Sequence, residues 1–133
     1  MKILVADDSR HIVEAIRIRL EHMGWEVLVA YDGQTALEVA KTQAPDLAVI
    51  DIYMPGYSGH MVLERLRQDS ATKDLPVIFL TAHATRPNRV HALNNGVMAV
   101  LPKPCEPELL ISTIQTAIEH INTANLPQLI TLT

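Results

Sequence analysis

Short apolar runs, rich in β-branched residues, alternate along this chain with longer segments whose apolar residues recur at helical spacing. The runs typical of buried strands lie at residues 2–6, 25–31, 47–50, 77–80 and 98–101, and the helical segments lie at 11–23, 34–43, around 61–66, 87–95 and from 107 onward. This alternation is the pattern of βαβ units, in which consecutive strands lie parallel and each helix crosses the sheet. The sequence therefore predicts five βα repeats.

The length of 133 residues decides between the folds that such repeats build. A closed eight-fold barrel needs about 250 residues. An open, doubly wound α/β sheet needs far fewer, so we expect a flavodoxin-like fold with five parallel strands in the order 2-1-3-4-5 and five helices. We expect one domain over residues 1–122 and a C-terminal tail or linker over residues 123–133, where Pro127 breaks the helical spacing.

Composition excludes several classes of partner. The net charge of −4 leaves no broad basic surface for nucleic acid or an anionic membrane. No stretch approaches the roughly 20 apolar residues that cross a bilayer. The only cysteine is Cys105, and the chain begins at Met1 without the layout of a signal peptide. We therefore expect a cytoplasmic protein with no direct nucleic-acid or membrane partner.

The polar residues of interest follow four of the five predicted strands. Asp7 and Asp8 follow the first strand, Asp51 the third, Thr81 the fourth and Lys103 the fifth. Ligands of open α/β sheets bind at the carboxyl ends of the strands. These four strands are neighbours in the order 2-1-3-4-5, so we expect the five side chains to meet in one pocket.

Three carboxylates in one pocket repel one another unless a cation lies between them. Oxygen ligands favour Mg²⁺, and the pocket lacks the His and Cys ligands that favour zinc. With a metal ion and Lys103 beside it, the carboxylate of Asp51 is a nucleophile for phosphorus. If a phosphoryl group is transferred to Asp51, the metal ion, Lys103 and the Thr81 hydroxyl would each hold one of its oxygens.

Four segments resemble the receiver domains of two-component response regulators: LVADDS, IDIYMPGYSG, FLTA and LPKP, spread over residues 1–122. The site residues that this resemblance implies are Asp51 as phosphoacceptor, Asp7, Asp8, Asp51 and the backbone carbonyl of Tyr53 as Mg²⁺ ligands, and Thr81, Ala82 and Lys103 around the phosphoryl group. It also implies a cis peptide bond between Lys103 and Pro104. Together, in order and each at a predicted strand end, these motifs are specific.

The resemblance also implies a function. Such a domain accepts a phosphoryl group from a phosphohistidine on a histidine kinase or phosphotransfer domain, forms an aspartyl phosphate, and changes conformation to control a partner or output domain. It is a switch rather than an enzyme, since its only catalysis is its own phosphorylation and dephosphorylation. Tyr53 and His83 occupy positions that tune phosphoaspartate hydrolysis in the family.

One position departs from the family pattern. The family usually carries an aromatic residue three positions before the lysine of the fifth strand, and this chain has Val100 there. We predict that output here relies on backbone movement of the loop after the fourth strand or on dimer formation. The last helix carries a broad apolar set, which fits either a core helix or, together with residues 87–95 and 98–101, a surface for a partner or homodimer.

Other interpretations compete with this one. Each polar residue, taken alone, fits a helix cap, a turn or a solvated charge. The domain could bind partners without being phosphorylated, although its complete residue set argues against this. A small aspartyl-phosphate hydrolase would usually carry a second aspartate where this chain has Tyr53, and a flavodoxin-like carrier would need a phosphate-binding loop where Asp7 and Asp8 lie. We interpret the six histidines, apart from His83, as surface or helix-face residues.

Overall fold

The structure is a computed structural model that describes residues 1–124, so most of the predicted tail lies outside the described residues. The strands are β1 (Lys2–Ala6), β2 (Glu26–Ala30), β3 (Leu47–Ile50), β4 (Val77–Thr81) and β5 (Ala99–Pro102), and the helices are α1 (Arg10–His22), α2 (Gly33–Gln43), α3 (Gly59–Gln68), α4 (Arg86–Asn94) and α5 (Pro107–Ala124). Strand and helix alternate throughout, as the sequence predicts. The last helix continues two residues beyond the predicted domain end at residue 122.

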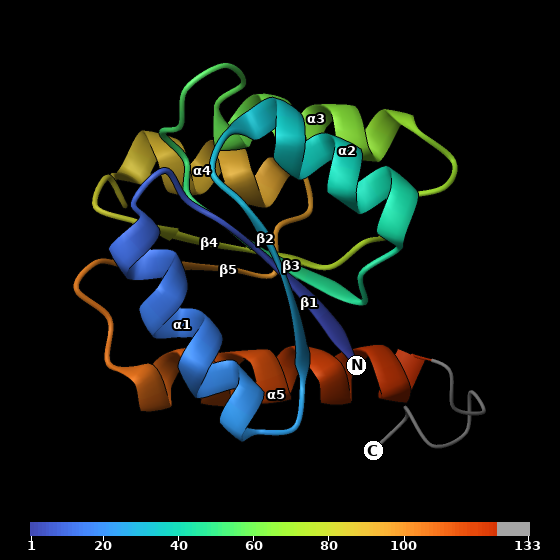
Figure 1. Ribbon diagram of the computed structural model, residues 1–133. Helices are drawn as coiled ribbons and strands as arrows, with labels where there is room; N and C mark the ends of the chain where they lie inside the picture. Colours follow the sequence, from blue (N-terminus) through green and yellow to red (C-terminus); the bar gives the residue numbers. More distant parts are fainter. Residues whose placement is uncertain (125–133) are drawn as a thin grey trace.

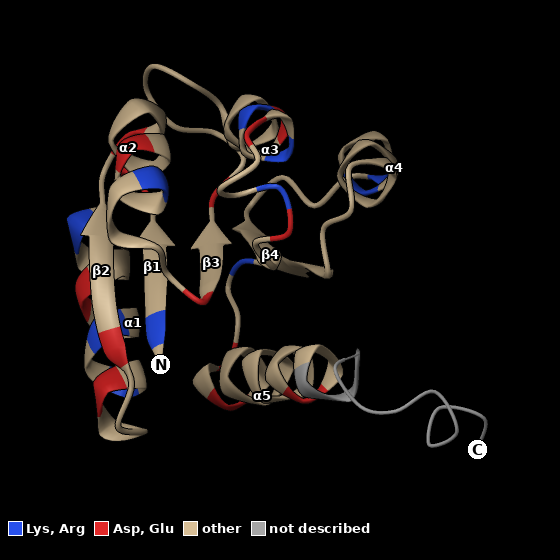
Figure 2. Ribbon diagram, turned by 90° about the vertical axis from the view of Figure 1, so that its right-hand side faces the viewer, with Lys and Arg blue, Asp and Glu red and all other residues tan. Residues whose placement is uncertain are grey.

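The five strands form one parallel sheet with the order β2-β1-β3-β4-β5. The predicted fold and strand order are therefore confirmed. Helices α2, α3 and α4 cover one face of the sheet, and α1 and α5 cover the other (Figure 1). The arrows of β1, β2 and β3 point the same way in Figure 2, so their carboxyl ends share one edge of the sheet.

Each face of the sheet has its own hydrophobic core, because successive residues of a strand point to opposite faces. In β1, Leu4 and Ala6 pack with the residues of α2, α3 and α4, whereas Ile3 and Val5 pack with those of α1 and α5. Both faces are thus covered. This explains why the strands are apolar without alternation.

A polar side chain caps the start of each of the first four helices. The side chains of Ser9, Asp32, Ser58 and Thr85 each accept a hydrogen bond from a backbone N–H in the first turn of the helix that follows. Such caps satisfy N–H groups that have no partner within the helix. These caps fix where each helix begins after the carboxyl end of the preceding strand.

The apolar set of α5 serves mainly as core. Leu110, Ile114 and Ala117 are buried against the sheet, whereas Leu109 is 47% exposed. The sequence allowed two interpretations of this helix, as a core helix or as a partner surface. The buried residues Leu110, Ile114 and Ala117 fit the first.

Candidate functional site

Three aspartates lie at the carboxyl ends of two neighbouring strands, β1 and β3. Asp7 and Asp8 follow β1, and Asp51 follows β3. The sheet hydrogen bonding continues past the strand ends, since Asp7 N donates to Ala30 O at 3.1 Å and Asp51 N donates to Ala6 O at 2.9 Å. The backbone at Asp7 and Asp51 is therefore fixed by neighbouring strands, which fixes where their side chains start.

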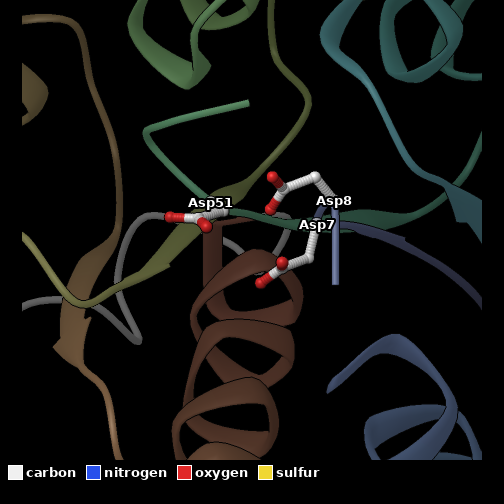
Figure 3. A group of neighbouring side chains, drawn as sticks. All are labelled: Asp7, Asp8 and Asp51. Carbon is white, nitrogen blue, oxygen red and sulfur yellow. The ribbon is translucent and has the colours of Figure 1, made fainter. Parts of the chain in front are cut away.

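The three carboxyl groups gather in one place, as Figure 3 shows. One oxygen from each of Asp7, Asp8 and Asp51 lies within 4.8 Å of the others. Asp7 and Asp51 are buried, at 3% and 8% exposure, while Asp8 is exposed. The cluster thus has two buried members and one that faces solvent. A metal ion or a phosphoryl group can therefore reach it from solvent.

Lys103, which follows β5, contacts both buried aspartates. Its Nζ lies 2.5 Å from Asp7 Oδ2 and 3.1 Å from Asp51 Oδ2. Partial burial acts to lower the pKa of Lys103, but the hydrogen bonds and charges of Asp7 and Asp51 outweigh burial and raise this pKa above its usual value. The lysine is therefore held as a cation between the two carboxylates.

The backbone at Lys103 is positioned by the adjacent strand. Lys103 N donates to Thr81 O at 2.9 Å. The peptide bond between Lys103 and Pro104 is cis, as the resemblance implies. Residues that follow β1, β3 and β5 thus lie together as predicted. The predicted place of the Thr81 hydroxyl in the same pocket stays a prediction.

The donor set fits a hard divalent cation. One ammonium group cannot balance three carboxylates, and oxygen-only ligands are those that Mg²⁺ prefers. Within residues 1–124, Asp51 Oδ1 is buried without a hydrogen-bond partner. A buried carboxylate oxygen with no partner is costly, and a metal ion or a phosphoryl group bound at this atom would relieve that cost. The predicted part of the Tyr53 carbonyl in binding the metal stays a prediction.

Thr81 and Ala82 lie at the end of β4, on the Lys103 side. Thr81 is fully buried, and its Oγ1 accepts a hydrogen bond from His83 N at 3.1 Å. Ala82 and Lys103 both line a hollow of about 630 Å³ between α1 and α5. The ring of His83 meets that of Tyr53 edge to face, with centroids 4.5 Å apart. The two residues expected to flank the pocket thus contact each other.

A second polar cluster, between α3 and α4, was missed by the sequence reasoning. His60 Nε2 lies 3.1 Å from Asn88 Oδ1, and the rings of His60 and His91 are 4.5 Å apart. The sequence interpretation described these histidines only as surface or helix-face residues. No sequence signal marks the cluster, because the residues come from two helices and meet only through packing.

The fold and this site define a class: doubly wound α/β domains with an acidic, cation-competent pocket and a lysine at the carboxyl ends of the strands. The sequence model of the response regulator receiver domain matches residues 3–115. The chain belongs to this family, and it is a receiver domain.

Individual comparisons agree with the family. The chain is 35% identical over 124 residues to the probable transcriptional regulator ycf27 of Porphyridium aerugineum, covering 93% of this chain and 50% of that protein. It is 35% identical over 118 residues to the phosphate regulon regulatory protein PhoB of Pseudomonas aeruginosa, covering 89% and 52%. The chain therefore spans about half the length of these two relatives.

Solved structures share the fold. A CheY-like receiver domain protein from Methanospirillum hungatei superposes with a TM-score of 0.88 at 27% identity, covering 93% of this chain and 98% of that one. The chemotaxis response regulator CheY4 of Vibrio cholerae gives 0.81 at 31% identity, covering 86% and 96%. None of the helices within residues 1–124 has the length and apolar character needed to span a membrane.

Proposed function

We propose that this receiver domain accepts a phosphoryl group on the Asp51 carboxylate with Mg²⁺ bound beside it. The observation that carries the proposal is the environment of Asp51. One of its oxygens is paired with Lys103, and the other is buried beside Asp7 and Asp8 with no hydrogen-bond partner in residues 1–124. An ionised carboxylate needs no general base to attack phosphorus. The groups around it have only to position and neutralise the incoming anion.

Each nearby residue has a distinct part in this proposal. Asp7, Asp8, Asp51 and the Tyr53 carbonyl would hold the metal ion, which when bound neutralises charge on the transferred group. Lys103 would bind one phosphoryl oxygen through the ammonium that now bridges the two buried aspartates. Thr81 would donate its hydroxyl hydrogen to another oxygen, and the small side chain of Ala82 would leave room for the group.

The proposed phosphoryl donor is a phosphohistidine on a histidine kinase or phosphotransfer domain, and the proposed outcome is a conformational change that controls a partner or output domain. Family membership supports both statements. The same reasoning assigns the domain no turnover beyond its own phosphorylation and dephosphorylation, and a cytoplasmic location, where members of this family typically act. The hydrolase alternative lacks support, since an exposed Tyr53 occupies the position of the second aspartate.

Intact-mass measurement after incubation with acetyl phosphate and Mg²⁺ tests the proposal. We expect a single phosphoryl adduct on the wild-type protein and none on Asp51→Asn. The matched control is Asp74→Asn, which neutralises an exposed aspartate away from the cluster and should leave the adduct intact. A wild-type protein that takes no adduct, or an Asp51→Asn variant that takes one, would contradict the assignment.

We further propose that the face formed by α4, β5 and α5 binds a partner or a second copy of the domain. Large apolar side chains are exposed on both helices: Val90 and Leu93 on α4, and Leu109 on α5. A hollow of about 600 Å³ lies between residues 96–99 and α5. Sedimentation of the protein with and without a phosphoryl mimic tests the homodimer. Leu93→Glu should weaken any association that is found.

A further inference from the structure

The loop between β4 and α4 is tied at both ends to neighbouring groups. At its start, His83 N donates to Thr81 Oγ1 at 3.1 Å. The carbonyl of His83 accepts two hydrogen bonds, from Thr85 N and from Asn88 Nδ2, each at 2.8 Å. The loop that carries His83 past the phosphoryl pocket is therefore held by Thr81 on one side and by a side chain of α4 on the other.

The amide of Asn88 has a defined orientation. Its Nδ2 faces the carbonyl oxygen of His83, and the reversed orientation would place two acceptor oxygens 2.8 Å apart with no hydrogen between them. Oδ1 must therefore face His60, whose Nε2 lies 3.1 Å away. Because an amide oxygen only accepts, Nε2 of His60 carries the hydrogen. The other ring nitrogen, Nδ1, is buried and has no hydrogen-bond partner among the described residues.

The ring of His60 is wedged between β4 and α4. It meets the ring of Phe79 edge to face at 5.4 Å and the ring of His91 edge to face at 4.5 Å. His91 in turn lies 3.1 Å from the carboxylate of Glu64 on α3. His60 lies in the first turn of α3 and contacts β4 and α4. Its position therefore depends on the distance between α3 and α4.

These contacts form a directional series of hydrogen bonds, defined here as the relay: His60 to Asn88, Asn88 to the carbonyl of His83, and the amide of His83 to Thr81 Oγ1. Since Thr81 Oγ1 already accepts the hydrogen bond from His83, its own hydrogen is directed elsewhere and is available to a phosphoryl oxygen. The relay runs from α3 to the pocket.

We infer that Asn88 and His60 are positioning residues, which hold the β4–α4 loop and the Thr81 hydroxyl in the resting arrangement through the relay. The inference rests on the proposed phosphorylation of Asp51. A phosphoryl group that draws Thr81 toward itself lengthens the bond from His83, and the loop moves with its carbonyl. The hydrogen bonds of Asn88 to His83 and to His60 then change, and with them the contact between α3 and α4. This route does not need an aromatic ring on β5, where this chain has Val100.

A substitution at Asn88 tests the relay. Asn88→Asp keeps an acceptor for His60 but replaces the donor to His83 with a second oxygen. We expect the freed loop to let the variant take up the phosphoryl group from acetyl phosphate and Mg²⁺ about fivefold faster, the factor that one lost hydrogen bond gives. The matched control is Asn94→Asp, which adds the same charge to an exposed position of the same helix. Its rate should stay within about twofold of wild type.

Nitrogen NMR of the histidine rings supplies a readout that general destabilisation does not move. In the unphosphorylated wild-type protein, His60 should show the tautomer with hydrogen on Nε2. The Thr81 and His83 amide signals should shift in Asn88→Asp and stay in place in Asn94→Asp. Phosphorylation of the wild-type protein should shift the His60 ring signals.

The outcomes separate the relay from the proposed function. If wild type forms no adduct, the phosphorylation proposal fails, and the relay is judged on the tautomer and the amide shifts alone. If wild type and Asn88→Asp form adducts at equal rates, phosphorylation stands and the positioning inference is overturned. A His60 tautomer with hydrogen on Nδ1 overturns it as well.

Discussion

Lys103 lies between two buried carboxylates that repel each other without it. Replacing it with methionine keeps most of the side-chain volume and removes the charge. Asp7 and Asp51 would then be buried without a cation, and breaking a buried pair in this way costs about 3 kcal/mol of unfolding free energy. We expect this loss for Lys103→Met in metal-free buffer, measured by urea unfolding, and no phosphoryl adduct by intact mass.

Lys41→Met is the matched control for Lys103→Met. Lys41 pairs with Asp69 at 3.6 Å on the surface, and exposed pairs of this kind contribute between about 0 and 1 kcal/mol. Equal losses in the two variants would show that Lys103 does not balance buried charge.

Asp32 caps α2, and its ionisation contributes to stability. Its carboxylate accepts hydrogen bonds from the backbone N–H and the hydroxyl of Thr35, which lower its pKa below the usual 3.8. A lowered folded-state pKa means that the contribution is present above pH 3.8 and is lost as pH falls through the folded value. Asp32→Ala should cost about 1 kcal/mol at pH 7.

Asp32→Asn separates the cap from the charge. Asparagine also caps helices well, so this variant should unfold at nearly the wild-type urea concentration at pH 7. On acidification from pH 5 to pH 3, it should lose less stability than wild type, because its cap does not titrate. If both proteins lose the same unfolding free energy between pH 5 and pH 3, ionisation of Asp32 does not contribute to stability.

The elements follow closely from the sequence, because the signals that define them are local. The strand runs and the helical spacing give all ten elements in the right order, with ends that differ by at most two residues where bounds were predicted. Ser9, Asp32, Ser58 and Thr85 lie where helices begin, and such caps are visible in a sequence. The contact between α3 and α4 was not predicted. Whether His60 meets Asn88 depends on how the two helices pack, which no local pattern encodes.

The start of α3 approaches the backbone of Asp51 so closely that only glycine fits. A Cβ atom added to Gly59 would lie 2.3 Å from Asp51 O and 2.8 Å from Ile52 Cα. Gly59→Ala would therefore push α3 and the Asp51 backbone apart. We expect it to cost about 2 kcal/mol or more of unfolding free energy and to slow adduct formation in the intact-mass assay.

Gly24→Ala is the control for Gly59→Ala. Gly24 has φ of +82°, and no atom of the described part of the chain lies within 4 Å of an added Cβ, so alanine there meets only backbone strain of about 1–2 kcal/mol. It lies away from the site and should leave the rate of adduct formation unchanged. A Gly59→Ala variant with wild-type adduct kinetics would show that the close approach does not position Asp51.

At the scale of the whole molecule, the pocket follows from strand order and not from sequence distance. Lys103 and Asp7 are 96 residues apart in the chain, yet they touch because β1, β3, β4 and β5 are neighbours. Once the order 2-1-3-4-5 was predicted, the gathering of the aspartates and the lysine could be predicted too. The pairing of Lys103 with both Asp7 and Asp51 could not, because it depends on side-chain directions that only the assembled fold determines.

Metal binding should stabilise the whole domain, since the cation would bind carboxylates that come together only when β1 and β3 are paired. At a Mg²⁺ concentration tenfold above the dissociation constant, linkage predicts a gain of about 1.4 kcal/mol in unfolding free energy. Urea unfolding in EDTA and in MgCl₂, at equal ionic strength, measures this gain.

The stability of Asp8→Asn relative to wild type should depend on the buffer. Removing one carboxylate relieves repulsion, so in EDTA the variant should be at least as stable as wild type. In MgCl₂ the variant should gain little, because the loss of one of the three carboxylates that could hold the ion weakens its binding. A gain from Mg²⁺ that is equal in both proteins would place the ion elsewhere than among Asp7, Asp8 and Asp51.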